Sequence, residues 1–188
     1  MKTEAYWEIF NEKGKLEKHV KAKSFVLGLI DLLYVHGSQI PFAIKDTLWV
    51  LGNAPSPIKP YANTFEVIAD SGDDAKGIQL GSGTTAPAID NYKLETKIEH
   101  GATAGKLSYG TCDISEPATF GNSRQFSVSR TFTNNTASSI TINEVGLICE
   151  ARKDDAIDLD ILIERSLLQF VIAAAANKTV VYTIKVTV

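Results

Sequence analysis

Residues 125–132 read QFSVSRTF, and this stretch decides the fold class of the chain. Apolar and polar residues alternate along it, so one side of an extended strand would carry Phe126, Val128, Arg130 and Phe132. A side-chain period of two is typical of a β-strand with one face against a core and the other face in water. Arg130 interrupts the apolar side, so we expect this face to meet a polar partner.

Further strand-like segments lie on both sides of this stretch, between residues 77 and 188. The strongest reads TVVYTIKVTV at residues 179–188, with many β-branched residues and a period close to two. The others are residues 77–81, 107–114, 140–149 and 161–172. About six short strands separated by turns favour an antiparallel β-sandwich, jelly-roll or Ig-like, over a fold that alternates strands and helices. We therefore predict a mainly β protein with a sandwich domain at residues 77–188.

A β-hairpin is predicted within residues 1–23. Tyr6–Phe10 is strand-like, residues 11–14 supply turn chemistry, and Leu16 and Val20 follow at strand spacing. An isolated two-stranded hairpin is only marginally stable in water. We therefore expect the hairpin to lie against the main domain or against a neighbouring subunit.

A short helix is predicted next, over residues 25–35, which read FVLGLIDLLYV after a possible N-cap at Ser24. This segment is apolar nearly all the way round, and such a helix must be buried on most faces. The sequence does not distinguish between burial of this helix in an oligomer interface and burial at the end of the sandwich. The predicted organisation is an N-terminal hairpin and helix arm at residues 1–35 and the sandwich at 77–188. A Pro-rich connecting region at 36–76 joins them, with strand-like segments at 47–51 and 65–69.

Composition and charge argue against several classes of partner. A net charge of -3 in 188 residues gives no electrostatic case for binding nucleic acid. Residues 1–8 show no signal-peptide pattern, and the apolar run at 25–35 has about half of the roughly 20 residues that cross a bilayer. We expect no membrane partner and synthesis in the cytosol. Cys112 and Cys149 lie in strand-like segments and are interpreted as small buried residues, with a disulfide between them as the less favoured alternative.

The residue types that carry catalysis do not converge. His19, His36 and His100 are scattered without the spacing of metal ligands. There is no phosphate-binding loop, and Gly81 and Gly83 are interpreted as turn residues. We expect no catalytic residue, no cofactor site and no metal site, and we predict that the chain is not an enzyme.

Two groups of carboxylates leave alternatives open. For the acidic run Asp154–Asp160, a solvated loop or a contact with a basic partner is favoured over a calcium site. Glu144 and Glu164 lie in otherwise apolar strands. For these two, a salt bridge at a sheet edge or an interface, with Arg130 or Arg165 as the partner, is favoured over a carboxylate pair of the hydrolase type.

Three parts of the sequence resemble, in the same order, segments of tailed-phage virion proteins. Residues 81–87 (GSGTTAP) and 90–94 (DNYKL) resemble a GTGTTAP…D-x-x-L segment. Residues 130–136 (RTFTNNT) and 140–147 (ITINEVGL) are similar to an R-x-F-x-N-x-[ST]…I-T-I-N-E-[IV]-G-L segment. Residues 162–165 (LIER) and 182–188 (YTIKVTV) are similar to an L-L-x-R…Y-x-I-x-V ending. The resemblance covers residues 77–188.

This resemblance implies a virion structural protein, made in the host cytoplasm and located in the virion. The expected function is that of a capsid decoration or cement protein, and a tail, neck or baseplate component is the alternative. A carbohydrate-binding module is a less favoured alternative. The implied partners are further copies of the chain, as a trimer or ring, and virion proteins such as the major capsid or tail protein. We expect the interface to include Trp7, Phe10, Phe25, Leu29, Leu32, Leu33 and Arg130.

Overall fold

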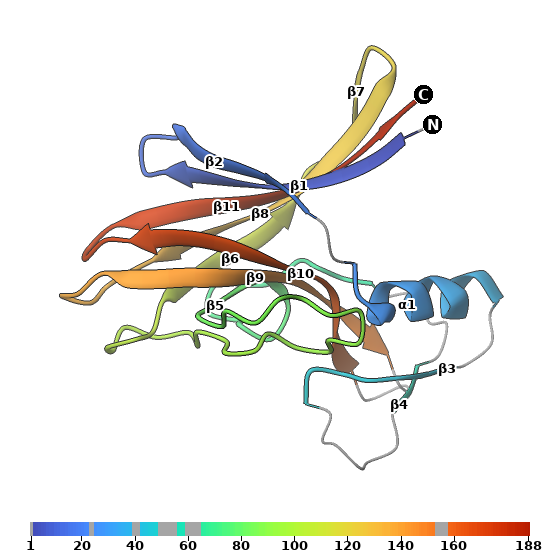
Figure 1. The fold of residues 1–188 in the computed structure, drawn as a ribbon, viewed down its shortest axis with the longest axis horizontal. Helices are drawn as coiled ribbons and strands as arrows, with labels where there is room; N and C mark the ends of the chain where they lie inside the picture. The colour runs from blue at the N-terminus through green and yellow to red at the C-terminus, as the bar shows by residue number, and fades with distance from the viewer. Residues whose placement is uncertain (1, 23–24, 39–41, 49–55, 59–64, 153–157) are drawn as a thin grey trace.

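Two antiparallel β-sheets pack face to face around one hydrophobic core (Figure 1). The computed structural model describes residues 2–22, 25–38, 42–48, 56–58, 65–152 and 158–188. The strands of the larger sheet are β1 (Lys2–Asn11), β2 (Leu16–Lys21), β6 (Ser108–Ile114), β7 (Ala118–Phe120), β8 (Ser123–Thr133) and β11 (Asn177–Thr187). Their order is β2-β1-β11-β8-β6, and β7 pairs with the beginning of β8.

The smaller sheet consists of β5 (Gly77–Gly81), β9 (Ile140–Arg152) and β10 (Asp158–Ile172), in the order β10-β9-β5. The prediction of an antiparallel β-sandwich is confirmed. The alternation in β8 is also as predicted, because Val128, Arg130 and Phe132 are buried while Ser129 and Thr131 are partly exposed. One face of β8 therefore belongs to the core.

The N-terminal hairpin is built into the larger sheet. β1 pairs with β11 over its whole length, from Lys2 opposite Thr187 to Asn11 opposite Lys178. Its core side carries Trp7 and Ile9, both fully buried. Of the two expected surroundings for the hairpin, the structure shows the main domain, and the predicted separate arm at residues 1–35 is corrected. The physical reason is that the odd-numbered residues of β1 form a core face, so removing this strand would remove part of the core.

The described residues between 36 and 76 contain less strand than expected. The strand-like segment at 65–69 makes only two isolated bridges, Glu66 with Glu150 and Ala69 with Cys112. Phe65 has a φ of 86°, which interrupts an extended backbone. Of the segment at 47–51, Thr47 and Leu48 form a turn and the rest lies outside the described residues. A short ribbon of β3 (Phe42–Ile44) and β4 (Ser56–Ile58) is present instead.

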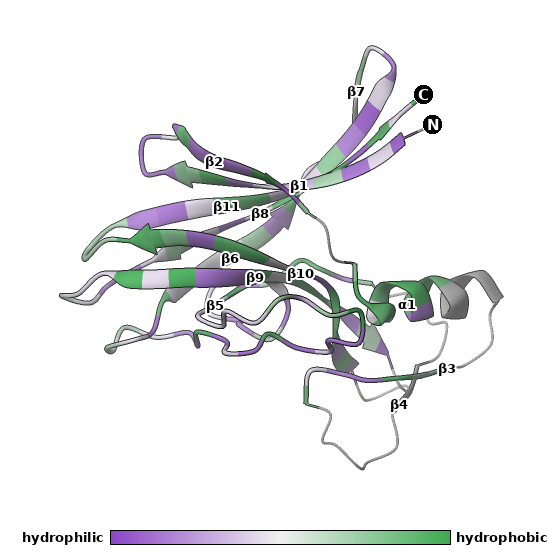
Figure 2. Ribbon diagram, in the orientation of Figure 1, coloured by the Kyte–Doolittle hydropathy of each residue, from purple (hydrophilic) through white to green (hydrophobic). Residues whose placement is uncertain are grey.

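The helix α1 (Leu27–Ser38) is confirmed, with its start two residues later than predicted. One side of α1 lies against β10. A Cβ atom at Gly28 would be 2.3 Å from the carbonyl oxygen of Leu162, so only glycine permits this approach. Leu32 is fully buried, whereas Leu33 is 56% exposed. Within residues 27–33, the expected burial on most faces is therefore met on one side only, and Figure 2 shows that this part of the helix is mostly apolar. Among the described residues, no helix is long and apolar enough to span a membrane.

Candidate functional site

The smaller sheet contains a buried carboxylate, Glu144 on β9, whose side chain is fully inaccessible to solvent. It accepts hydrogen bonds from the backbone N–H groups of Gly83 (3.1 Å), Glu95 (3.1 Å) and Thr96 (2.8 Å). It also accepts a hydrogen bond from Nε of Arg165 on β10, at 2.8 Å. These four donors, one of them a cation, provide hydrogen-bond partners for both oxygens of the buried carboxylate. The predicted pairing with Arg165 is confirmed, whereas the predicted place at a sheet edge or an interface is wrong, because both side chains are buried within the chain.

Two glycines make room for this carboxylate. A Cβ atom at either Gly81 or Gly83 would lie 2.5 Å from Oε1 of Glu144. Gly81 ends strand β5 rather than forming a turn, so the interpretation as a turn residue is corrected for this position. Both glycines are required because a carboxylate approaches their backbone closely.

Arg165 fixes the loop that crosses over Glu144. Its Nη1 donates to Oδ1 of Asn91 at 2.9 Å, and its Nη2 donates to the backbone oxygen of Thr85 at 3.0 Å. The Glu95 carboxylate lies 3.6 Å from Nη2. The segments at residues 81–94, 140–147 and 162–165, each of which carries part of the resemblance, therefore meet in one network around Glu144 and Arg165.

The second buried carboxylate, Glu164, precedes Arg165 and points to the opposite face of β10, into the space between the sheets. Nε1 of Trp7 donates to Oε2 of Glu164 at 3.0 Å, and the Ser166 hydroxyl donates to Oε1. Burial raises the pKa of Glu164 to about 8, so the carboxyl is protonated at neutral pH. The prediction of Arg130 as a partner for Glu164 is wrong. Neighbouring Tyr182 is buried, and its hydroxyl has no hydrogen-bond partner within the described part of the chain.

Arg130 finds its polar partners inside the protein. Its guanidinium donates to the backbone oxygens of Gly110 (2.9 Å), Lys76 (3.0 Å), Ile78 (3.3 Å), Asp70 (3.3 Å) and Asp73. It also stacks over the ring of Tyr109, with its Cζ atom 4.8 Å from the ring centre. Arg130 therefore ties the loop before β5 to β6 and β8, and the expectation that it contacts another subunit is corrected.

The other predicted interface residues fall into three groups. Trp7 and Leu32 are fully buried in the core of this chain and are not available to a partner. Phe10 and Leu29 are partly exposed. Phe25 and Leu33 are exposed, and the structure places three further apolar side chains near them: Leu27, Ile30 and Ile89. The three-residue spacing of Leu27, Ile30 and Leu33 could have predicted from the sequence that they share one side of the helix. Nothing in the sequence predicts that Ile89 lies beside them.

We call Phe25, Leu27, Ile30, Leu33 and Ile89 the helix surface. The residues on α1 recur every third position, so they follow one side of the helix. Ile89 lies next to them because the backbone N–H of Leu27 donates to the backbone oxygen of Ile89 at 2.8 Å. The helix surface is the part of the predicted interface that remains accessible.

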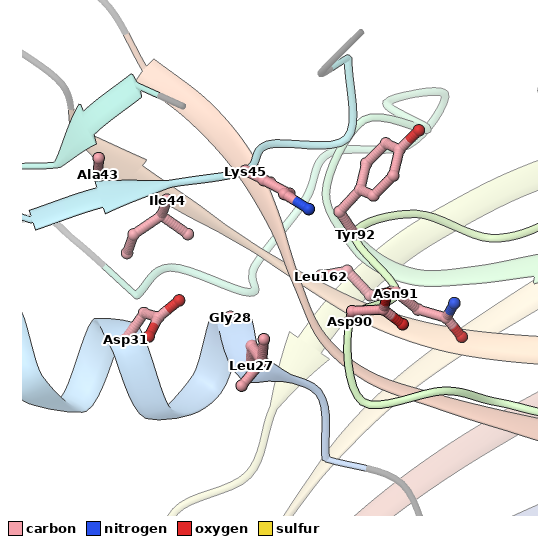
Figure 3. A pocket seen from close by; sticks show the side chains of 10 residues that line it. All are labelled: Leu27, Gly28, Asp31, Ala43, Ile44, Lys45, Asp90, Asn91, Tyr92 and Leu162. Carbon is pink, nitrogen blue, oxygen red and sulfur yellow. The ribbon is translucent and has the colours of Figure 1, made fainter. Parts of the chain in front are cut away.

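A small cavity lies beside α1, between Asp31, Ile44, Lys45 and Tyr92 (Figure 3). Burial raises the pKa of Asp31. The volume of about 110 Å³ is below the range of roughly 300–1,000 Å³ that is common for small-molecule sites. The cavity therefore has room for a few water molecules rather than for a metabolite.

The remaining polar residues show no convergent chemistry in the part of the chain that the structure describes. No group of three or more His, Cys, Asp or Glu residues is arranged to hold a metal ion there. Most of the acidic run Asp154–Asp160 lies outside the described residues, but Asp158 pairs with Arg152 at 2.8 Å. Burial raises the pKa of Asp160 to about 6. Cys112 and Cys149 are both buried and free.

No protein-family model matches this chain, and neither curated proteins nor solved structures yielded a match.

Proposed function

We propose that this chain is a structural protein of a tailed-virus particle, a capsid decoration protein that binds copies of itself and other virion subunits. The observation that carries the proposal is the network around Glu144 and Arg165. The resembling segments are separated in sequence by tens of residues, yet they supply the glycines, the carboxylate and the guanidinium of one buried unit. The meeting of parts of three resembling segments in one buried unit supports the proposal.

A non-catalytic role is supported by the positions of the two buried glutamates. Glu144 and Glu164 point to opposite faces of the smaller sheet, and both are fully buried. A hydrolase-type pair needs two carboxyl groups that flank one accessible substrate bond. Neither glutamate reaches such a position, so their burial favours an assembly role over glycan hydrolysis.

The location in the particle can be tested by fractionation. Particles of the virus that encodes this chain would be grown with an epitope-tagged copy, purified, and separated into capsids and tails. We expect the tagged chain to sediment with capsids and to be detected there by immunogold labelling. Recovery with tails alone would instead identify a tail, neck or baseplate component, and absence from both fractions would refute the virion role.

A parallel binding assay addresses the remaining alternative. The purified chain would be presented to an array of bacterial surface glycans. A carbohydrate-binding module needs accessible aromatic side chains, and of the two tryptophans Trp7 is buried, so the comparison variant is Trp49→Ala. We expect no binding above background for either protein. Specific glycan binding that is lost on Trp49→Ala would favour a carbohydrate-binding module over a decoration protein.

A further inference from the structure

We propose that the helix surface binds the same surface of a second copy of this chain, in a contact with two-fold symmetry. This deepens the proposed function and rests on it in one respect only, namely that a decoration protein needs contacts between subunits. The contact would centre on Ile30, which lies between Leu27 and Leu33 on the exposed side of α1.

The helix surface leaves a large apolar area uncovered. The exposed fractions are 40% for Phe25, 43% for Leu27, 57% for Ile30, 56% for Leu33 and 66% for Ile89. The exposed areas of these five residues add up to on the order of 500 Å². An area of this size is near the upper end of apolar patches on ordinary monomers. A standard interface buries roughly 800 Å² on each partner, of which roughly 60% is apolar. The area of this surface is therefore what one half of a stable dimer requires.

The distribution of charge favours a second copy as the occupant. None of the five side chains is charged, and the single charged residue among residues 25–33, Asp31, lines the cavity beside Ile44 and Lys45 (Figure 3). The five side chains therefore bring no charge of their own into the contact, and the exposed Asp90 follows Ile89 beside it.

The helix surface is held on a firm base. Gly28 allows α1 to touch the backbone of β10, and Val26 packs against Ile148 and Leu162 in a small buried cluster. The backbone N–H of Val26 donates to the oxygen of Ile163 at 3.3 Å. Because these contacts fix the start of the helix on the sandwich, the exposed residues are presented in one orientation, which lowers the entropy lost on association.

The outer edges of the two sheets are less suitable for self-association. The free edge of β2 carries Glu17, Lys18 and Lys21, and charged residues on an edge strand oppose pairing between chains. Along β10, the ammonium group of Lys18 donates to the backbone oxygen of Gln169. β10 also contains an irregularity between Leu167 and Phe170, which disrupts a continuous edge.

The test measures the mass of the full chain in solution by sedimentation equilibrium, for the wild type and for three variants. Ile30→Glu and Ile30→Lys each place a charge at the centre of the contact. The control Ile68→Glu makes the same change at a residue that is 45% exposed and lies outside the helix surface. We expect the wild type and the control to have twice the monomer mass of 20.4 kDa. We expect each Ile30 variant to raise the dissociation constant at least about 100-fold.

A mixture of the two Ile30 variants tests the symmetry. Opposite charges meet across a two-fold axis only if residue 30 faces residue 30, so we expect the equimolar mixture to regain a mass of two chains. Unchanged thermal unfolding of each variant would establish that the monomers are folded. A monomeric wild type, or a dimer that survives Ile30→Glu, would overturn the proposal.

Other occupants give distinct results. If the wild type is monomeric but binds virus particles through Ile30, the occupant is another virion protein, and the proposed function stands while this inference fails. If the dimer forms as expected but the chain is absent from particles, the inference stands and the proposed function fails. A trimer or ring that dissociates on Ile30→Glu would confirm the surface and refute the two-fold symmetry.

Discussion

Glu144 and Glu164 lie in neighbouring strands of the smaller sheet, both are fully buried, and the protein accommodates them in opposite ways. Glu144 faces the loop at residues 82–97, where Arg165 and three backbone N–H groups stabilise its charge. Glu164 faces the space between the sheets, where it meets two neutral donors, and burial raises its pKa to about 8. Burial alone therefore does not decide the charge of a carboxyl group, because the donors around it do.

The largest effect is expected from Glu144→Gln. This change removes the closer, buried counter-ion of Arg165 and leaves only the Glu95 carboxylate, 3.6 Å from Nη2. Removal of one partner of a buried ion pair typically costs about 3–5 kcal/mol. The loss should appear as a lower midpoint in urea unfolding. Glu99→Gln is the matched control, because Glu99 forms an exposed ion pair with Lys106. The urea midpoint of this variant should equal that of the wild type. Equal midpoints for the two variants would show that the network does not stabilise the fold.

The next effect is a dependence of stability on pH that originates at Glu164. Because its folded-state pKa of about 8 lies above the ordinary value of 4.5, the folded protein holds this proton more tightly than the unfolded chain does. This contribution to stability is complete below about pH 4.5 and is lost as the pH rises to about 8. The free energy of unfolding should fall by at most about 1.4 kcal/mol per pH unit in that window.

Glu164→Gln isolates this effect. Glutamine keeps the shape of the protonated carboxyl group and cannot ionise, so the variant should match the wild type near pH 5 and exceed its stability above pH 8. Asp160, whose pKa burial raises to about 6, titrates in the same window, but it does so in both proteins. The difference between the two unfolding curves therefore reports Glu164. A difference that does not change with pH would refute a protonated Glu164.

A smaller effect is expected from Gly83→Ala, which acts on the Glu144 side of the comparison. The added Cβ atom would lie 2.5 Å from Oε1 of Glu144 and 2.6 Å from Cβ of Glu95. Overpacking of this kind typically costs about 1–3 kcal/mol. Ser82→Ala, at an exposed position in the same loop, should leave thermal unfolding unchanged. If Gly83→Ala also leaves the thermal unfolding temperature unchanged, the loop can move away from the Glu144 carboxylate.

The smallest effect belongs to Tyr182, on the Glu164 side. Its hydroxyl is buried without a partner in the described part of the chain, and a buried unsatisfied group is unfavourable. Tyr182→Phe removes the hydroxyl and keeps the aromatic ring, whose centre lies 4.5 Å from the ring centre of Trp7. We expect stability that is unchanged or about 1 kcal/mol higher. A clear destabilisation in urea unfolding would instead reveal a hydrogen bond to this hydroxyl.

Sequence reasoning recovered the features that depend on local patterns. The alternation at residues 125–132 predicted a half-buried strand, and the apolar run at 25–35 predicted the helix. Of the two arginines expected as partners of Glu144, the structure shows Arg165, and the sequence pattern does not distinguish between them. Features that depend on contacts between distant segments were missed. Trp7 belongs to the core because β1 pairs with β11, and Arg130 is internal because five carbonyl groups from other segments converge on it. No periodicity within β1 or β8 contains that information.

The pairing of β1 with β11 also has a consequence for the time course of folding. The neighbours of β1 in the larger sheet are β2, which follows it directly, and β11, which follows every other described strand. During synthesis the ribosome must therefore release residues 177–187 before Trp7 and Ile9 can be covered. Contacts between such distant segments slow folding and prolong the exposure of apolar surface. We expect the early hairpin to expose apolar side chains on the nascent chain until β11 has been synthesised.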